Sequence, residues 1–110
     1  MKVLDIVDKL GLILISGESG LNREITGGYV SDLLSDVMGN SKEGQVWVTL
    51  QTHKNVMAIA SLKDLAAVIL VKGFKPDTDM LAQSNEEGVP VLSTTENTFE
   101  MAGKLYEILK

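Results

Sequence analysis

The chain has 110 residues, of which 45% are hydrophobic, and a formal net charge of −5. This hydrophobic fraction is sufficient for a folded core, and we expect one domain over residues 1–110. The acidic balance argues against a general nucleic-acid-binding protein, because such proteins use Lys and Arg to neutralise phosphates. Cysteine is absent, which excludes disulfides and cysteine-based metal sites.

The first ten residues place Asp5, Asp8 and Lys9 among apolar side chains, which is not typical of a signal peptide. No apolar run approaches the ~18 residues that span a bilayer. We therefore expect a soluble, cytoplasmic protein with no membrane contact.

Hydrophobic periodicity predicts alternating helices and strands along the whole chain. The run "AVILV", residues 67–71, is the strongest candidate for a buried strand. The expected elements are a helix over 3–10 stopped by Gly11, a buried strand over 12–15, a strand over 25–30, a helix around 33–38, a strand over 46–50, a helix over 56–62, a strand over 67–71, a helix stopped by Gly88, a short strand over 89–92 and a helix over 99–109.

Several expected boundaries depend on single residues. Ser31 and Asn55 are predicted to cap the second and third helices, and Asp77 or Thr78 the fourth. Pro90 lacks a backbone N–H, which suggests that the strand over 89–92 lies at an edge of the sheet.

Strands that are apolar throughout and separated by helices are typical of a parallel sheet covered on both faces. The expected fold is an α/β three-layer sandwich with a mostly parallel sheet of about five strands and helices on both faces. The last helix is expected to pack through one face that carries Phe99, Ala102, Leu105, Tyr106 and Leu109.

Residues 16–23, "SGESGLNR", follow an apolar run and look like the start of a phosphate-binding loop. A working loop reads Gly-x-x-x-x-Gly-Lys-Ser/Thr, because the Lys reaches the phosphates and the hydroxyl holds magnesium. Asn22, Arg23 and Glu24 stand where the second glycine, the lysine and the hydroxyl are needed. We therefore interpret this segment as a strand-to-loop turn and expect no catalytic residue and no enzyme.

The next segment, "NREITGGYVSDLLSDVMGN" over residues 22–40, resembles the signature of the DRTGG domain family. Asn22 replaces the usual acid of that motif, which leaves Arg23 without its local carboxylate neighbour. The similarity continues through "GQVWVTLQTHKNVMAIAS", "AAVILVKGFKPDTDML" and "GVPVLSTTENTFEMAGKLYEI", and so covers about the full length.

The resemblance implies a non-catalytic regulatory or ligand-sensing module, often dimeric. Such domains occur in phosphotransacetylases, in pyrophosphatases with CBS domains and as stand-alone chains, and the amino-terminal domain of HPr kinase has a similar fold. No cofactor is expected. His53 is the only histidine, so a multi-histidine metal centre is excluded.

Three polar loops are expected at the carboxyl edge of the sheet, where open α/β sheets bind ligands. One of them opens a helix, whose free N–H groups suit an anion. The candidate ligand-binding residues in these loops are Gln51, Thr52, His53, Asn55, Lys72, Gly73, Ser93 and Thr94. Solvated surface and helix capping, in which one of the hydroxyls of residues 93–95 would take part, stay open as alternatives.

A second candidate site consists of Arg23, Thr26, Gly27 and Gly28. The guanidinium of Arg23 suits a phosphate or carboxylate, and the glycines permit a close backbone approach. The alternative is tight packing in the fold or across a dimer interface, with Arg23 in an ion pair.

Asp32 and Asp36 lie four residues apart on an expected helix and are interpreted as part of a solvated face rather than as paired carboxylates. The leading functional hypothesis is a homodimeric regulatory module that senses an anionic metabolite or nucleotide. The alternatives are a protein-interaction subunit that docks on a larger enzyme and, with less support, a phosphotransfer protein related to HPr kinase.

Overall fold

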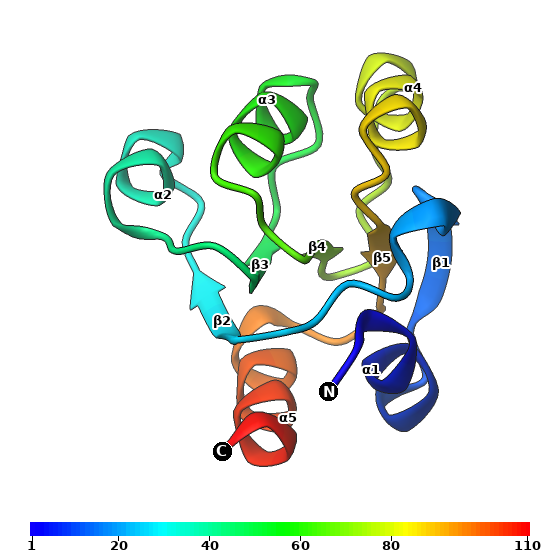
Figure 1. Cartoon of the computed structure of the whole chain (residues 1–110). Coiled ribbons are helices and arrows are strands. Elements are labelled where there is room, and N and C mark those ends of the chain that lie inside the picture. Colours follow the sequence, from blue (N-terminus) through cyan, green and yellow to red (C-terminus); the bar gives the residue numbers. More distant parts are fainter.

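The computed structural model describes residues 1–110, which form five helices, five strands and one short 3-10 turn (Figure 1). In chain order these are α1 (Val3–Leu10), β1 (Ile13–Ser16), η1 (Glu18–Gly20), β2 (Gly27–Val30), α2 (Leu34–Asn40), β3 (Gln45–Thr49), α3 (Asn55–Leu62), β4 (Ala67–Leu70), α4 (Thr78–Glu87), β5 (Val91–Ser93) and α5 (Thr98–Leu109).

The five strands form one sheet in the order β1-β5-β4-β3-β2. Strands β2 to β5 are mutually parallel, and β1 is antiparallel to β5. Trp47 in the centre of β3 pairs with Tyr29 on one side and with Val68 on the other. The expected mostly parallel five-stranded α/β sheet is therefore confirmed.

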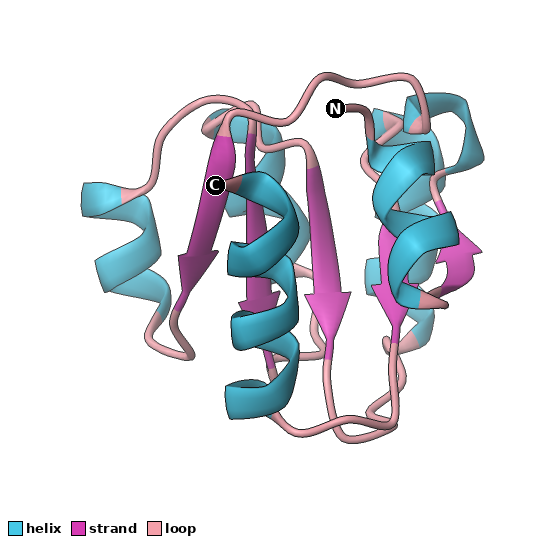
Figure 2. Cartoon of the chain, turned by 90° about the horizontal axis from the view of Figure 1, so that it is seen from below, coloured by secondary structure: helices cyan, strands magenta, loops and turns pink.

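Helices α1 and α5 cover one face of the sheet, and α2, α3 and α4 cover the other (Figure 1). Figure 2 shows α5 lying along the parallel strands. Val46 and Val48 pack toward α1 and α5, whereas Trp47 between them packs toward α2, α3 and α4. This alternation explains why the central strands are apolar at every position: both of their faces are buried.

The helix termini largely follow the sequence signals. Gly11 and Gly88 end α1 and α4 in the left-handed conformation, with φ of 63° and 67°. The carboxylate of Asp77 caps α4 by accepting the N–H of Met80 at 2.8 Å. Both types of signal act locally, within one turn of the backbone, and both predictions are confirmed.

Two predicted caps are wrong. Ser31 does not cap α2, because its hydroxyl accepts the N–H of Leu33 at 3.1 Å in a turn that precedes the helix. Asn55 does not cap α3 either: it is the first helical residue, and Lys54 before it makes no side-chain capping bond.

Two predictions about the sheet edge are also wrong. The strand expected over 12–15 is not fully buried, since β1 is an edge strand and Ile13 is 59% exposed. Pro90 does not mark an edge, because β5 lies between β1 and β4. The proline precedes the first residue of β5, where its missing N–H costs no bond within the strand ladder.

The packed face of α5 differs from the expected one. Met101 and Leu105 are its buried residues, whereas Phe99 is 84% exposed and Tyr106 69% exposed. Asn97 caps the helix by accepting the N–H of Glu100 at 2.8 Å, so no residue of 93–95 is needed for that role.

Candidate functional site

The loops that follow β2, β3, β4 and β5 lie together at the carboxyl edge of the parallel strands, and we name residues 31–33, 50–54, 71–77 and 94–97 the carboxyl rim. Six of the eight candidate ligand-binding residues in these loops belong to the rim, and two lie directly next to it. They are Gln51, Thr52 and His53 after β3, Asn55 at the start of α3, Lys72 and Gly73 after β4, and Ser93 and Thr94 at the end of β5.

Asp32 joins the first two rim loops. Its Oδ1 accepts the hydroxyl of Thr49 at 2.8 Å and the N–H of Leu50 at 2.8 Å. Gln51 Nε2 donates to the backbone carbonyl of Asp32, also at 2.8 Å. Asp32 is exposed, as expected, but its expected place on a helix is wrong, since it precedes α2 and holds the end of β3.

Backbone hydrogen bonds join the remaining rim loops. The N–H of Asp77 donates to the carbonyl of Thr52 at 2.8 Å, which links the loops after β3 and β4. The N–H groups of Lys72 and Gly73 donate to the carbonyls of Glu96 and Thr94, each at 2.8 Å. The rim is therefore a continuous hydrogen-bonded surface rather than four independent loops.

Lys72 adopts a left-handed backbone conformation with φ of 59°. This conformation is unfavourable for a residue with a Cβ, and it costs about 1–2 kcal/mol relative to glycine. The adjacent Gly73 has φ of 73°. A non-glycine residue in this conformation at a loop of this kind is a feature often found at functional sites.

The rim carries lysines without carboxylate partners. Its acidic groups are engaged elsewhere: Asp32 holds β3, Asp77 caps α4, and Glu96 forms an ion pair with Lys104. Lys54, Lys72 and Lys75 form no ion pair in the structure. The rim thus presents free cationic groups on a protein whose net charge is negative.

Arg23 and Thr26 lie at the opposite, amino edge of the sheet. Arg23 Nε donates to the carbonyl of Gly88 at 2.9 Å, and its Nη1 pairs with Asp64 at 3.1 Å. Arg23 has no carboxylate neighbour at position 22, where an acid was expected and Asn22 stands, but Asp64 provides one. The structure therefore separates Arg23 from the rim residues and gives its guanidinium a role in joining three distant segments.

The threonine and glycines of the motif have different neighbours. Thr26 donates its hydroxyl to the carbonyl of Glu43 at 2.8 Å and lies against Gly44, where a Cβ would stand 2.7 Å from the Thr26 side chain. A Cβ on Gly28 would stand 3.2 Å from Leu105. The small residues allow β2 and α5 to approach closely.

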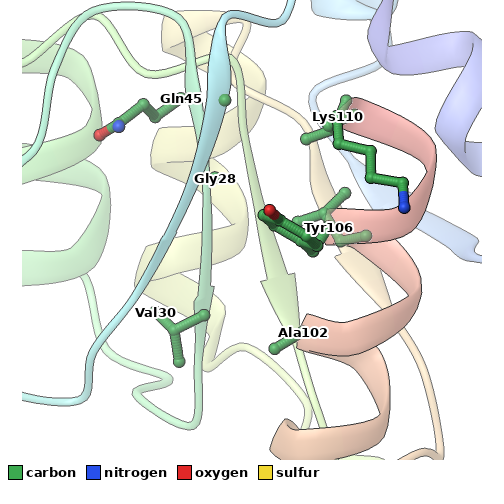
Figure 3. Close-up of a pocket in the computed structure, with 9 residues that line it drawn as sticks. Gly28, Val30, Gln45, Ala102, Tyr106 and Lys110 are labelled. Carbon is green, nitrogen blue, oxygen red and sulfur yellow. The ribbon is translucent and has the colours of Figure 1, made fainter.

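Beside this contact is a cavity of about 460 Å³, which we name the β2–α5 groove. Figure 3 shows it along the edge of β2, with Tyr106 and Lys110 projecting from α5. Its lining residues are Gly27, Gly28, Val30, Gln45, Ala102, Leu105, Tyr106, Leu109 and Lys110. Sequence reasoning found the two glycines but missed the part that α5 contributes, because the periodicity of α5 favoured burial of Tyr106.

The glycines of "SGESG" are required by packing. A Cβ on Gly17 would lie 2.4 Å from the carbonyl oxygen of Val89, and one on Gly20 would lie 2.1 Å from that of Gly88. The N–H of Gly17 donates to the side chain of Asn85 at 2.8 Å. These contacts place the loop against the segment before β5 and account for its glycines without a phosphate.

Tyr29 and Asp36 form a local pair on the face that α2 covers. The Tyr29 hydroxyl donates to the Asp36 carboxylate at 2.9 Å, so Asp36 is not merely solvated. The Ser31 hydroxyl, Tyr29 and Asn40 lower the pKa of Asp36. Burial, followed by the bond to Asp36 and its negative charge, raises the pKa of Tyr29.

No group of three or more His, Asp or Glu side chains is arranged to hold a metal ion. None of the five α-helices combines the length and apolarity that a bilayer crossing requires.

The five-stranded sheet, covered by helices on both faces, defines a small α/β domain in which two glycines of β2 lie beside α5. The DRTGG domain model matches residues 5–108, and the chain belongs to the DRTGG domain family. No curated protein matches the sequence.

A solved structure has a similar fold: the crystal structure of the CBS and DRTGG domains of the regulatory region of Clostridium perfringens pyrophosphatase, complexed with its activator diadenosine tetraphosphate. The TM-score is 0.74 at 15% sequence identity. The alignment covers 96% of this chain and 45% of the other, so this protein spans less than half of that regulatory region.

Proposed function

We propose that the chain is a non-catalytic regulatory module that binds a small anionic metabolite or nucleotide at the carboxyl rim and acts as a homodimer. The ligand site is supported by three lysines that form no ion pair, Lys54, Lys72 and Lys75. They lie on loops that hydrogen bonds join to one another. Free cations on a fixed frame attract an anion without a large ordering cost.

The rest of the rim can supply hydrogen bonds. Gln51, Thr52 and His53 are half-buried, and beside them the N–H of Asn55, the first residue of α3, makes no backbone hydrogen bond. Together with the three lysines, these groups give the rim both positive charge and hydrogen-bond donors, which is the chemistry that recognises an anion.

The family and the similar structure support a regulatory role. The regulatory region of the Clostridium perfringens enzyme contains a DRTGG domain and binds a nucleotide activator. For the present chain we propose the same class of ligand, an anion that bears phosphates, as the first to be tested.

The test is calorimetric titration with AMP, ATP, diadenosine tetraphosphate and acetyl phosphate, supported by thermal shift. The variant Lys54→Ala/Lys75→Ala should weaken the binding of the best ligand at least about tenfold, since two charge contacts are lost. Lys9→Ala/Lys42→Ala removes the same charge away from the rim and should change affinity by less than about twofold. Absence of heat and of thermal shift across the panel would reject the ligand site.

A second candidate function is a regulatory subunit that docks on a larger enzyme. It is favoured by the coverage of the similar structure, in which the matched domain makes up 45% of a longer regulatory chain. Pull-down with the tagged full chain from native lysate tests it: a stoichiometric enzyme partner supports docking, and recovery of the chain alone contradicts it.

A further inference from the structure

Strand β2 is the last strand of the sheet and pairs only with β3. Its outer edge therefore faces away from every other strand of the chain. Open edges of this kind readily pair with a strand of another chain, and proteins usually protect them with charges, bulges or proline. Gly27, Gly28, Tyr29 and Val30 carry no charge, and no proline interrupts them.

Next to this edge, α5 presents a stripe of small and aromatic residues. Phe99, Ala102, Gly103 and Tyr106 follow helical spacing, and the two aromatic residues are largely exposed. A Cβ on Gly103 would meet no atom within 4 Å, so packing inside the chain does not require a glycine there. Glycine within a helix is about 1 kcal/mol less favourable than alanine. The glycine at position 103 therefore needs an explanation outside the packing of a single chain.

We infer that a second copy of this chain occupies the edge of β2 and the β2–α5 groove. In this arrangement the two β2 strands pair antiparallel about a twofold axis perpendicular to the sheet, which gives one continuous sheet of both copies. The same surface of each copy meets itself, as a twofold interface requires. This inference rests on the proposed homodimer and names its surface.

The geometry of the helices agrees with this pairing. Helix α5 packs on both β2 and β3. An axis placed between these two strands lies about half a strand spacing inside β2. The twofold axis lies about half a spacing outside β2. With strands about 4.8 Å apart, the two α5 helices would be about 10 Å apart, close to the 8–10 Å of packed helices. Ala102 and Gly103 permit that approach, and Tyr106 of each copy fits the groove of the other.

The charges of α5 also match. Leu105 lies over Gly28, near the centre of β2, so antiparallel α5 helices would cross near residue 105. Lys110 of one copy then lies near Glu100 of the other. Both side chains are exposed, and the only ion pair that either forms within the chain is that of Lys110 with Glu107. Opposite charges meet twice in such a dimer, which favours a second copy over an unrelated apolar ligand in the groove.

The first test is the mass of the protein by light scattering over a dilution series from tens of micromolar. We expect wild-type protein at twice the 11.9 kDa of one chain. Gly103→Arg should weaken the dimer about ten- to hundredfold by blocking the approach of the helices. It should not lower the melting temperature of the dilute monomer, because Arg is a better helix former and has open space.

The matched control is Gly39→Arg, which places the same residue at an exposed glycine of α2 where a Cβ also meets nothing within 4 Å. The control should leave the dimer intact. A wild-type monomer, a dimer that survives Gly103→Arg, or equal dissociation by both variants would overturn the inference. Ligand titration is independent of these outcomes, so failure of the rim site is distinguishable from failure of the interface.

A charge-reversal pair tests the direction of the helices. Lys110→Glu should weaken the dimer about two- to fivefold, and adding Glu100→Lys should restore it, because the pair is re-formed across the axis. Failure of the double variant to recover would contradict the antiparallel pairing of α5.

Discussion

The backbone N–H of Lys72 donates to the carbonyl of Glu96 at 2.8 Å, and this bond fastens the loop after β4 to the loop after β5. It is made while Lys72 holds a left-handed conformation. The carboxyl rim therefore depends on a locally strained residue whose side chain is also one of its free cations.

Replacing Lys72 by glycine separates these two properties. Lys72→Gly should raise the free energy of unfolding by about 1 kcal/mol, because glycine adopts positive φ without the Cβ clash. The same change should weaken binding of a phosphate-bearing ligand several-fold, since one cation is lost. Urea denaturation and calorimetry measure the two effects. A variant that is both less stable and equally good at binding would contradict this role of Lys72.

Arg23 is expected to contribute to stability and not to ligand binding. Arg23→Ala removes a donor from the carbonyl of Gly88 and the partner of Asp64, and should lower the free energy of unfolding by about 1–2 kcal/mol. Asp64→Asn removes only an exposed ion pair and should cost less than about 1 kcal/mol. Loss of ligand affinity in Arg23→Ala without loss of stability would instead assign the amino edge to binding.

The glycine-rich loop gives a matched comparison. Gly17→Ala should be strongly destabilising, by about 3 kcal/mol or more, because the new Cβ would meet the backbone of Val89 and φ is 76°. Gly11→Ala also faces a positive φ of 63° but has open space, and should cost only about 1 kcal/mol. Equal effects of the two substitutions would show that the contact with Val89 is unimportant.

The Tyr29–Asp36 pair predicts a pH dependence. The pKa of Asp36 is lowered from its ordinary value of 3.8, so its stabilising contribution is complete above that pH and is lost as the pH falls through the folded-state pKa. The pKa of Tyr29 is raised from 10.0, so its contribution is complete below that pH and is lost as the pH rises through the raised value.

Asp36→Asn and Tyr29→Phe test this dependence. Asp36→Asn should be less stable than wild type at pH 6, and the difference should shrink as the pH is lowered below 3.8. When the pH is raised from 9 to a value above 10.0, the free energy of unfolding of Tyr29→Phe should fall by less than that of wild type. A difference in the free energy of unfolding between wild type and Asp36→Asn that is constant with pH would contradict a lowered pKa of Asp36.

The sequence was most informative where the signal is local or purely apolar. The αL glycines Gly11 and Gly88 and the cap Asp77 act within one turn of the backbone, and "AVILV" is buried on both faces whatever its neighbours are. The layer architecture follows from such elements. Sequence reasoning failed for Pro90, because strand order is a tertiary property that no residue of the strand specifies.

The candidate site was anticipated in part. The rim loops could be placed because parallel strands bring their carboxyl ends to one edge. The ion-pair partner of Arg23 could not be predicted from the sequence, since Asp64 is 41 residues away in the chain. The role of α5 was also missed, because helical periodicity alone does not distinguish Tyr106 beside an open groove from Leu105 in the core.

The most direct test of the carboxyl rim is amide chemical-shift mapping of the full chain titrated with ATP. We expect saturable shifts at residues 51–55, 72–75 and 93–97, with little change at Arg23, Gly27 and Gly28. Shifts confined to the amino edge or the β2–α5 groove, or no shifts at millimolar ATP, would contradict a ligand site at the rim.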